Sequence, residues 1–228
     1  VLIDIAPSPA DQMFEAEDQE GELVTLPISD DSPKALLVFK TTADPYVGKL
    51  TYFRVYGGAV SSAETVYNVR ADENERLGQI FSMQGNEQLS LETLHAGDIG
   101  AVAKMAEALT GDTLTDEEHP IVMEGPTFPE PLYSVSINPV SKADTAKMGS
   151  TLTRLCEEDP TLHWHQDPIT NETILSGMGD THVGTAVRRM QSRFNVNVEQ
   201  KTPKVPYRET VTAVGASEYR HKKQSGGA

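Results

Sequence analysis

Three prolines within six residues, Pro126, Pro129 and Pro131, divide this 228-residue sequence into two stretches with different hydrophobic periods. Before them, short β-prone runs alternate with turn signals and no long helical repeat occurs. After them, two segments carry apolar residues at the three- and four-residue spacing of amphipathic helices. Because the length suits two modest domains better than one large one, we expect two units that meet near Gly125.

The first stretch predicts an all-β unit. Its turn signals include Ala96-Gly97-Asp98 and Gly111-Asp112. Many short strands at near-regular spacing indicate a closed barrel or a sandwich, and closure leaves no unpaired strand edge. The candidate strands are residues 35–41, 50–56, 65–69, 78–83, 89–94, 99–104 and 121–124.

The second stretch predicts a ferredoxin-like unit. Ser141 can accept a hydrogen bond from an early backbone N–H of a helix, and Asp144 favours the positive end of that helix. The helix presents Met148, Leu152 and Leu155 on one face and ends before Pro160. With strands at 132–138, 162–166, 173–176 and 195–200 and a second helix at 180–194, the order is β-α-β-β-α-β.

Charge is spread unevenly over the chain, whose formal net charge is -15. Residues 1–33 hold nine acidic residues and no Lys or Arg, and residues 10–33 are polar enough to predict a connector or a weakly ordered arm. The acidic total argues against non-specific coating of nucleic acid, which needs clustered cations. Only residues 201–228 are basic, with six Lys or Arg and two Glu.

The sequence contains no motif that is typical of a nucleotide-binding or catalytic site. No G-x-x-x-x-G-K-[ST] phosphate loop occurs, and Gly177-Met178-Gly179 does not extend into a dinucleotide fingerprint. His163 and His165 share one face of a predicted strand, where a solvated surface is a better interpretation than a metal site without a third ligand. We therefore expect no catalytic residue, no cofactor-binding residue and no metal ligand in this chain.

Cys156 is the only cysteine, so it forms no internal disulfide, and a reducing cytoplasm is the simplest location. Its neighbours Glu157, Glu158 and Asp159 should raise its pKa, which argues against a nucleophile. No apolar run is long enough for a transmembrane helix, so we expect no membrane partner.

Several motifs, in order along nearly the whole chain, resemble the elongation factor G family of translational GTPases. The resemblance to its barrel domain, domain II, lies in FKT…ADPYVGKLTYFRVYG at 39–57, LHAGDIGAV at 94–102 and TGDTL at 110–114. The resemblance to its domain III lies in FPEP at 128–131, LCEEDPTL at 155–162 and TILSGMG at 173–179. Residues 201–210 and 221–227 resemble the passage into domain IV and its first motif, and 2–9 the end of the GTPase domain.

The resemblance implies a division of the chain. Residues 1–33 would be a remnant of the GTPase-domain end with an acidic linker, 34–125 the domain II β-barrel, 126–205 the ferredoxin-like domain III, and 206–228 a truncated start of domain IV. The chain would then be a non-enzymatic, monomeric fragment of a cytoplasmic protein that binds GTP and Mg²⁺ elsewhere. That protein would act in translocation of tRNA and mRNA or in ribosome recycling.

The resemblance also implies partners and site residues. The barrel would rest on small-subunit ribosomal RNA, with Lys49, Arg54 and Arg76 as candidate phosphate contacts, and no DNA partner is implied. Domain III would lie near a small-subunit protein and between the chain's own GTPase domain and domain IV. The residues that would line its cleft toward the GTPase switch region, where fusidic acid binds in this family, are Pro131, Thr161, Thr181, His182 and Arg189.

Two departures from the family pattern concern this cleft. Thr181 stands where the family has leucine, and Gly184 stands where it has glutamate. These departures suggest a divergent paralogue rather than the housekeeping factor. Two other interpretations stay open from the residues: a ribosomal protection protein of the tetracycline-resistance type, and a stand-alone RNA-binding barrel with a ferredoxin-like module.

Overall fold

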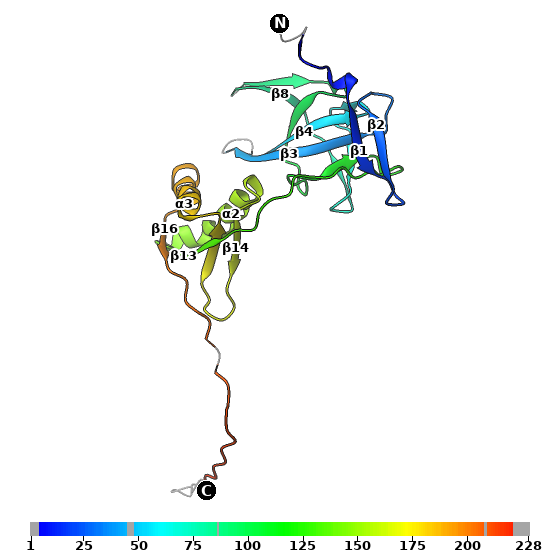
Figure 1. The fold of residues 1–228 in the computed structure, drawn as a ribbon. Helices are drawn as coiled ribbons and strands as arrows, with labels where there is room; N and C mark the ends of the chain where they lie inside the picture. The colour runs from blue at the N-terminus through cyan, green and yellow to red at the C-terminus, as the bar shows by residue number, and fades with distance from the viewer. Residues whose placement is uncertain (1–4, 45–47, 86, 208, 221–228) are drawn as a thin grey trace, which may run out of the picture.

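Two hydrophobic cores lie on opposite sides of the proline-rich segment 126–131 (Figure 1). The computed structural model describes residues 5–44, 48–85, 87–207 and 209–220. Parts of the family resemblance at 2–4, 45–47, 208 and 221–227 therefore lie outside the described residues. Within the described part, no helix is long and apolar enough to cross a membrane.

The first unit is built on an eight-stranded antiparallel sheet with the order β7-β6-β12-β3-β4-β11-β8-β9. Val66 on β6, Phe53 on β4 and Ile80 on β8 are all at most 1% exposed and share one core, so the sheet must curl around it. A separate ribbon of β5 and β10 adds Val60 and Leu94 to that core. The strands are β3 (Ala35–Asp44), β4 (Gly48–Gly57), β5 (Val60–Ser61), β6 (Thr65–Asn68), β7 (Glu73–Arg76), β8 (Ile80–Gln84), β9 (Glu87–Leu91), β10 (Thr93–Leu94), β11 (Ile99–Ala103) and β12 (Thr113–Thr115).

The prediction of a β-rich first unit is confirmed, but individual strands differ. Residues 121–124 form no strand; Val122 makes only an isolated bridge to Glu17. The short strands β7 and β12 were not predicted, because β7 reads Glu-Asn-Glu-Arg and carries no apolar alternation. Strand β12 follows a turn signal directly and is only three residues long, although all three are buried.

The prediction of a connector or weakly ordered arm at 10–33 is wrong. After a short 3-10 helix, η1 (Pro9–Asp11), strands β1 (Met13–Glu17) and β2 (Leu23–Pro27) form an antiparallel hairpin. Phe14 and Ala16 of β1 alternate with exposed residues and pack with Ile28, Ala35 and Met123 in a third, smaller core. The exposed positions of β1 include Glu15 and Glu17. Because of such acidic residues, the alternation of buried and exposed positions in β1 was not recognised in the sequence.

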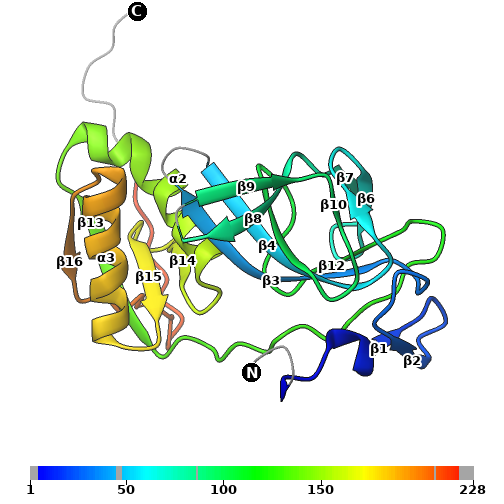
Figure 2. The same ribbon diagram turned by 90° about the horizontal axis from the view of Figure 1, so that it is seen from above.

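The second unit is the predicted β-α-β-β-α-β fold, with a four-stranded sheet in the order β14-β15-β13-β16. Its two helices cover one face of the sheet (Figure 2), and Leu152, Val183, Met190 and Leu175 are fully buried between the layers. Ser141 accepts a hydrogen bond from the Asp144 N–H at 3.2 Å, as predicted. The elements are β13 (Tyr133–Pro139), α2 (Lys142–Glu158), β14 (His163–Gln166), β15 (Thr173–Gly177), α3 (Asp180–Phe194) and β16 (Val198–Lys201).

The connection between the units is anchored at both ends. Gly125 lies so close to Gly111 of the barrel that a Cβ at Gly125 would be 2.8 Å from the Gly111 carbonyl oxygen. The Leu132 N–H donates to the Gly177 carbonyl of the second unit at 3.1 Å. Beyond β16, the chain extends away from both units without further helix or strand in its described part (Figure 1).

Candidate functional site

The outer face of the barrel carries cations and aromatic rings side by side. Strand β4 points Tyr52, Arg54 and Tyr56 away from the core because Thr51, Phe53 and Val55 point into it. The Arg54 guanidinium lies 5.1 Å from the centre of the Tyr56 ring, and the Lys40 ammonium lies 5.6 Å from that of Tyr52. We call Phe39, Lys40, Tyr52, Arg54 and Ile99 the barrel patch.

The remaining members of the barrel patch are apolar and exposed. Phe39 is 41% exposed, and its ring centre is 6.4 Å from that of Tyr52. Ile99 is 55% exposed and is paired with Arg54 across β11 and β4. Exposed rings next to cations can stack on bases and contact phosphates, which is the chemistry of single-stranded nucleic-acid binding.

Arg54 is half-buried and has no carboxylate partner among the described residues. Its Nε is buried and has no hydrogen-bond partner among the described residues. The side chain is held over Tyr56 by a cation–π contact rather than by a carboxylate. A cation without a competing carboxylate can pair with a phosphate at little cost.

Lys49 and Arg76, the other two predicted RNA contacts, do not lie with Arg54. The Lys49 side chain is only 14% exposed; its Nζ donates to the Ala106 carbonyl at 3.3 Å and lies 3.8 Å from Glu157 on α2. Arg76 ends strand β7 at one edge of the sheet, where its Nε donates to the Ala63 carbonyl at 3.3 Å. The structure therefore groups Arg54 with Lys40, which sequence reasoning missed.

In the second unit, His182 and Thr161 meet at one carboxylate, that of Asp159. Thr161 Oγ1 donates to Asp159 Oδ1 at 2.6 Å, and the Thr161 N–H donates to the same oxygen at 3.0 Å. His182 Nε2 lies 2.9 Å from Asp159 Oδ2. Burial opposes the charged carboxylate, but these hydrogen bonds outweigh it and hold the pKa of Asp159 below its ordinary 3.8.

The surroundings of His182 select one tautomer. Its Nδ1 accepts a hydrogen bond from the Met178 N–H at 3.1 Å, so this nitrogen carries no proton. Nε2 is therefore the donor to Asp159, and the ring is neutral when both bonds are made. The pair joins the end of α2 to the turn before α3, and it holds the backbone N–H of Met178 in that turn.

The other predicted cleft residues lie around this turn. Thr181 is exposed in the first turn of α3, and its N–H donates to its neighbour Asp180 at 2.6 Å. Arg189 is half-buried two helical turns after His182, on the same side of α3. Pro131 directly precedes Leu132, whose N–H bonds to Gly177. Sequence reasoning missed the contact between Asp159 and His182, because it treated Asp159 only as the helix end and as an anion beside Cys156.

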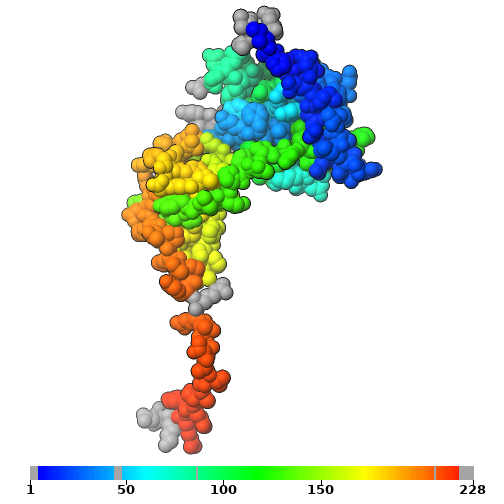
Figure 3. Space-filling model, in the orientation of Figure 1, coloured from blue at the N-terminus to red at the C-terminus, as the bar shows by residue number. Residues whose placement is uncertain are grey.

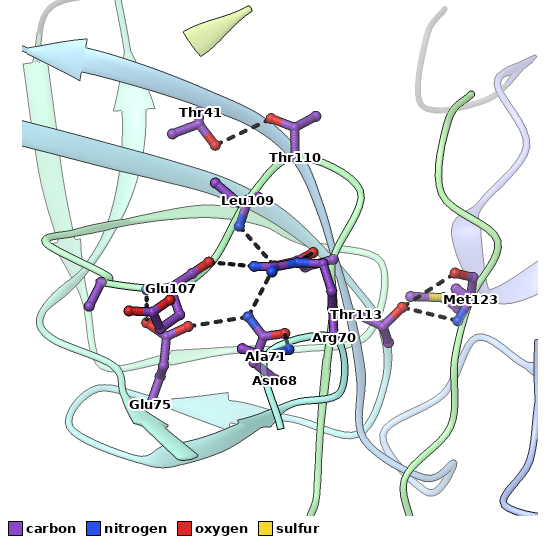
Figure 4. A network of polar contacts seen from close by, with 12 residues as sticks. Thr41, Asn68, Arg70, Ala71, Glu75, Glu107, Leu109, Thr110, Thr113 and Met123 are labelled. Atoms are coloured by element: carbon purple, nitrogen blue, oxygen red, sulfur yellow. Dashed lines mark hydrogen bonds and ion pairs between the residues drawn. The ribbon is translucent and has the colours of Figure 1, made fainter. Parts of the chain in front are cut away.

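A buried polar network lies inside the barrel, away from both of these places (Figure 4). The Asp112 carboxylate, 4% exposed, accepts from Arg70 Nε at 2.6 Å and from Arg70 Nη2 at 3.0 Å. Asn68 Nδ2 and the Leu109 N–H donate to it at 3.0 Å and 2.8 Å. The bond to Asp112 raises the pKa of Arg70, and the network ties the loop before β12 to β6.

Cys156 is half-buried on α2, and His163 and His165 lie on β14. Burial, and then Asp159 and Glu157, raises the pKa of the Cys156 thiol to about 11. Desolvation is thus the larger cause, whereas the sequence suggested only the anions. His163 and His165 are both exposed on the sheet face away from the helices, and no group of three or more potential metal ligands occurs in the described ranges.

Comparison with known proteins agrees with both units. Residues 33–117 match the family model for Elongation factor G domain 2, and residues 128–202 match that for Elongation Factor G, domain III. A crystal structure of a protein from Thermus thermophilus is similar to 78% of the chain, with 32% sequence identity and a TM-score of 0.69. The chain spans 27% of the length of that protein.

Proposed function

The chain belongs to the elongation factor G family, whose domain 2 and domain III it carries in that order, and we propose that it is the part of a cytoplasmic translational GTPase that rests on the small ribosomal subunit. The GTPase domain, with its GTP and Mg²⁺, would lie in another part of the same protein. This part of the protein would contribute to translocation of tRNA and mRNA or to ribosome recycling.

The observation that carries the proposal is the barrel patch. Arg54 and Lys40 lie over half-buried tyrosine rings, next to the exposed Phe39 ring, and among the described residues neither cation has a carboxylate as a partner in an ion pair. Such a surface contacts phosphate and stacks on bases without reading a sequence, which suits a fixed position on ribosomal RNA. The acidic remainder of the chain would limit binding to this patch.

The second unit would transmit the nucleotide state. The turn at 177–182 is held by one carboxylate and one neutral histidine, so a switch loop that docks against it meets a fixed surface. A docking surface that binds one arrangement of domains better than another shifts the population toward it. Thr181 and Gly184, which depart from the family pattern at this turn, support assignment to a divergent paralogue.

Salt-dependent binding to purified small ribosomal subunits tests the proposal. Arg54→Glu should weaken binding by about tenfold and lower the slope of log K against log salt by about one, because one phosphate contact is lost. Arg188→Glu, an exposed arginine on α3, is the matched control and should leave both values unchanged. Equal affinity of the Arg54→Glu variant and the wild-type chain would remove the barrel patch from the interface.

A second measurement separates this chain from the catalytic part of the parent protein. The purified chain should hydrolyse no GTP above the buffer rate, because its sequence has no phosphate loop. Turnover that follows the chain through purification would contradict the assignment of its domains.

A further inference from the structure

Strand β1 is paired along its whole length on only one of its edges, the edge toward β2. Ile28 donates to the Gln12 carbonyl at 3.2 Å and Asp18 to the Glu22 carbonyl at 3.1 Å, so the even-numbered residues direct their backbone groups at β2. Backbone groups alternate in direction along an antiparallel strand. Met13, Glu15 and Glu17 therefore direct theirs at the opposite edge.

That opposite edge is occupied only at its end. Glu17 and Val122 exchange two backbone hydrogen bonds of 2.8 Å each. The next residue, Met123, directs its backbone to the other side, where its N–H donates to Thr113 Oγ1 at 3.0 Å and that hydroxyl donates back to the Met123 carbonyl at 3.4 Å (Figure 4). No further residue bridges to this edge, so in the described part of the chain the backbone N–H and C=O of Met13 and Glu15 have no partner.

A groove of about 480 Å³ lies beside these unpaired groups. Apolar side chains form part of its wall, among them Leu37, Tyr56 and Met123. Among the described residues, Glu15, Glu17 and Glu124 are the charged ones that line it, and no Lys or Arg does. The space-filling view shows the hairpin, in dark blue, along the flank of the barrel next to the green segment that follows β12 (Figure 3).

We propose that this groove binds an extended, basic segment of a partner protein, which adds to β1 as a further strand. An open strand edge pairs readily with an incoming extended chain, and alternate side chains then enter the groove or face away. Apolar side chains of the segment would contact Leu37 and Tyr56, while its Lys or Arg residues would meet the three glutamates. Nucleic acid does not fit here, because its phosphates would face carboxylates.

This site adjoins the barrel patch at Tyr56, over which Arg54 lies, but it differs from the patch in chemistry and partner. The patch offers cations to phosphates, whereas the groove offers carboxylates and backbone groups to a peptide. The inference stands on the hairpin geometry alone and does not depend on ribosome binding.

A capped, fluorescein-labelled peptide of alternating lysine and valine, seven residues long, is the probe, and its anisotropy with the full chain is the measurement. Glu15→Pro removes the N–H that points at the groove and leaves the bonds between β1 and β2 intact, because Glu15 donates none of them. It should weaken binding about tenfold, the value of one backbone hydrogen bond. Thr25→Pro, which changes the opposite edge of β2, is the matched control and should bind as wild type does.

Two further arms keep the test decisive if the proline variant misfolds. Glu15→Lys preserves the backbone and should weaken binding of the basic peptide through charge alone. A peptide of alternating glutamate and valine should not bind the wild-type chain. Absence of binding at 1 mM basic peptide, or equal loss with Thr25→Pro and Glu15→Pro, would overturn the proposal. A concentration-dependent dimer abolished by Glu15→Pro, without peptide binding, would place a second copy in the groove and also overturn it.

Discussion

Removal of the Asp112 carboxylate should destabilise the barrel and leave the second unit intact. In Asp112→Ala, the Leu109 N–H loses its acceptor, and the fully buried Asn68 amide loses one of its two acceptors and keeps Glu75. Each buried donor left without a partner costs about 1–3 kcal/mol. The Arg70 side chain is 48% exposed, so water screens its loss, and its share is at most about 1 kcal/mol. The expected total is about 3 kcal/mol.

Urea unfolding with two probes measures this loss. Trp164 is the only tryptophan and is half-buried against the second core, so its fluorescence reports that unit alone. Far-UV circular dichroism reports both units. For a unit of this size, the urea dependence is about 1 kcal/mol per molar, so the barrel midpoint should fall by about 3 M. The Trp164 midpoint should not move.

The control is Glu73→Ala, which removes an exposed carboxylate from β7 and should change stability by less than about 0.5 kcal/mol. A loss below about 1 kcal/mol in Asp112→Ala would refute the role assigned to the network. A joint fall of both midpoints would refute the independence of the two cores.

Two further predictions concern the second unit. Because the folded-state pKa of Asp159 is lowered, its contribution to stability is present above the unfolded pKa near 3.8 and is lost as pH falls through the lower folded value. In urea unfolding followed by Trp164, Asp159→Asn should therefore lose more stability relative to wild type at pH 7 than at low pH, and an equal loss at both would contradict the role of the charge. The Cys156 thiol, with its pKa raised to about 11, should react with iodoacetamide far more slowly than free cysteine in mildly alkaline buffer, and reaction at the free rate would show that the thiol is not buried.

Long periodic segments can be predicted from the sequence because their local signals agree with their packing. The second helix is expected at 180–194 and α3 occupies the same residues, since Val183 and Met190 on one face enter the core. The Ser141 cap is likewise visible, because its partner Asp144 lies three residues away. For the helix and for its cap, the residues that determine the structure lie within one short stretch of chain.

Features that depend on distant residues could not be predicted. The β1–β2 hairpin carries its apolar residues, such as Phe14 and Ala16, between acidic ones, and only the third core shows why they are buried. The ribbon of β5 and β10 joins two-residue strands from distant parts of the barrel sequence, and such strands are too short for a periodic signal. Residues 121–124 have the composition of a strand, but the backbone N–H and carbonyl of Met123 are hydrogen-bonded to the Thr113 hydroxyl.

In the candidate sites, too, single residues could be named from the sequence, but their contacts with distant residues could not. A lysine at position 49 looks like a surface cation, yet folding places it against the Ala106 carbonyl and Glu157. Arg54 and Lys40 come together because a bulge between Val38 and Lys40 shifts the register of β3 against β4. His182 could be named from a motif, but its neutral tautomer follows from Met178 and Asp159, which no spacing rule identifies.

Chemical footprinting of ribosomal RNA in the presence of the chain tests the central claim most directly. With wild-type chain, we predict protected nucleotides on the small subunit only, lost at high salt and absent with Arg54→Glu. Protection confined to the large subunit, or the same small-subunit protection with Arg54→Glu as with wild type, would contradict the account.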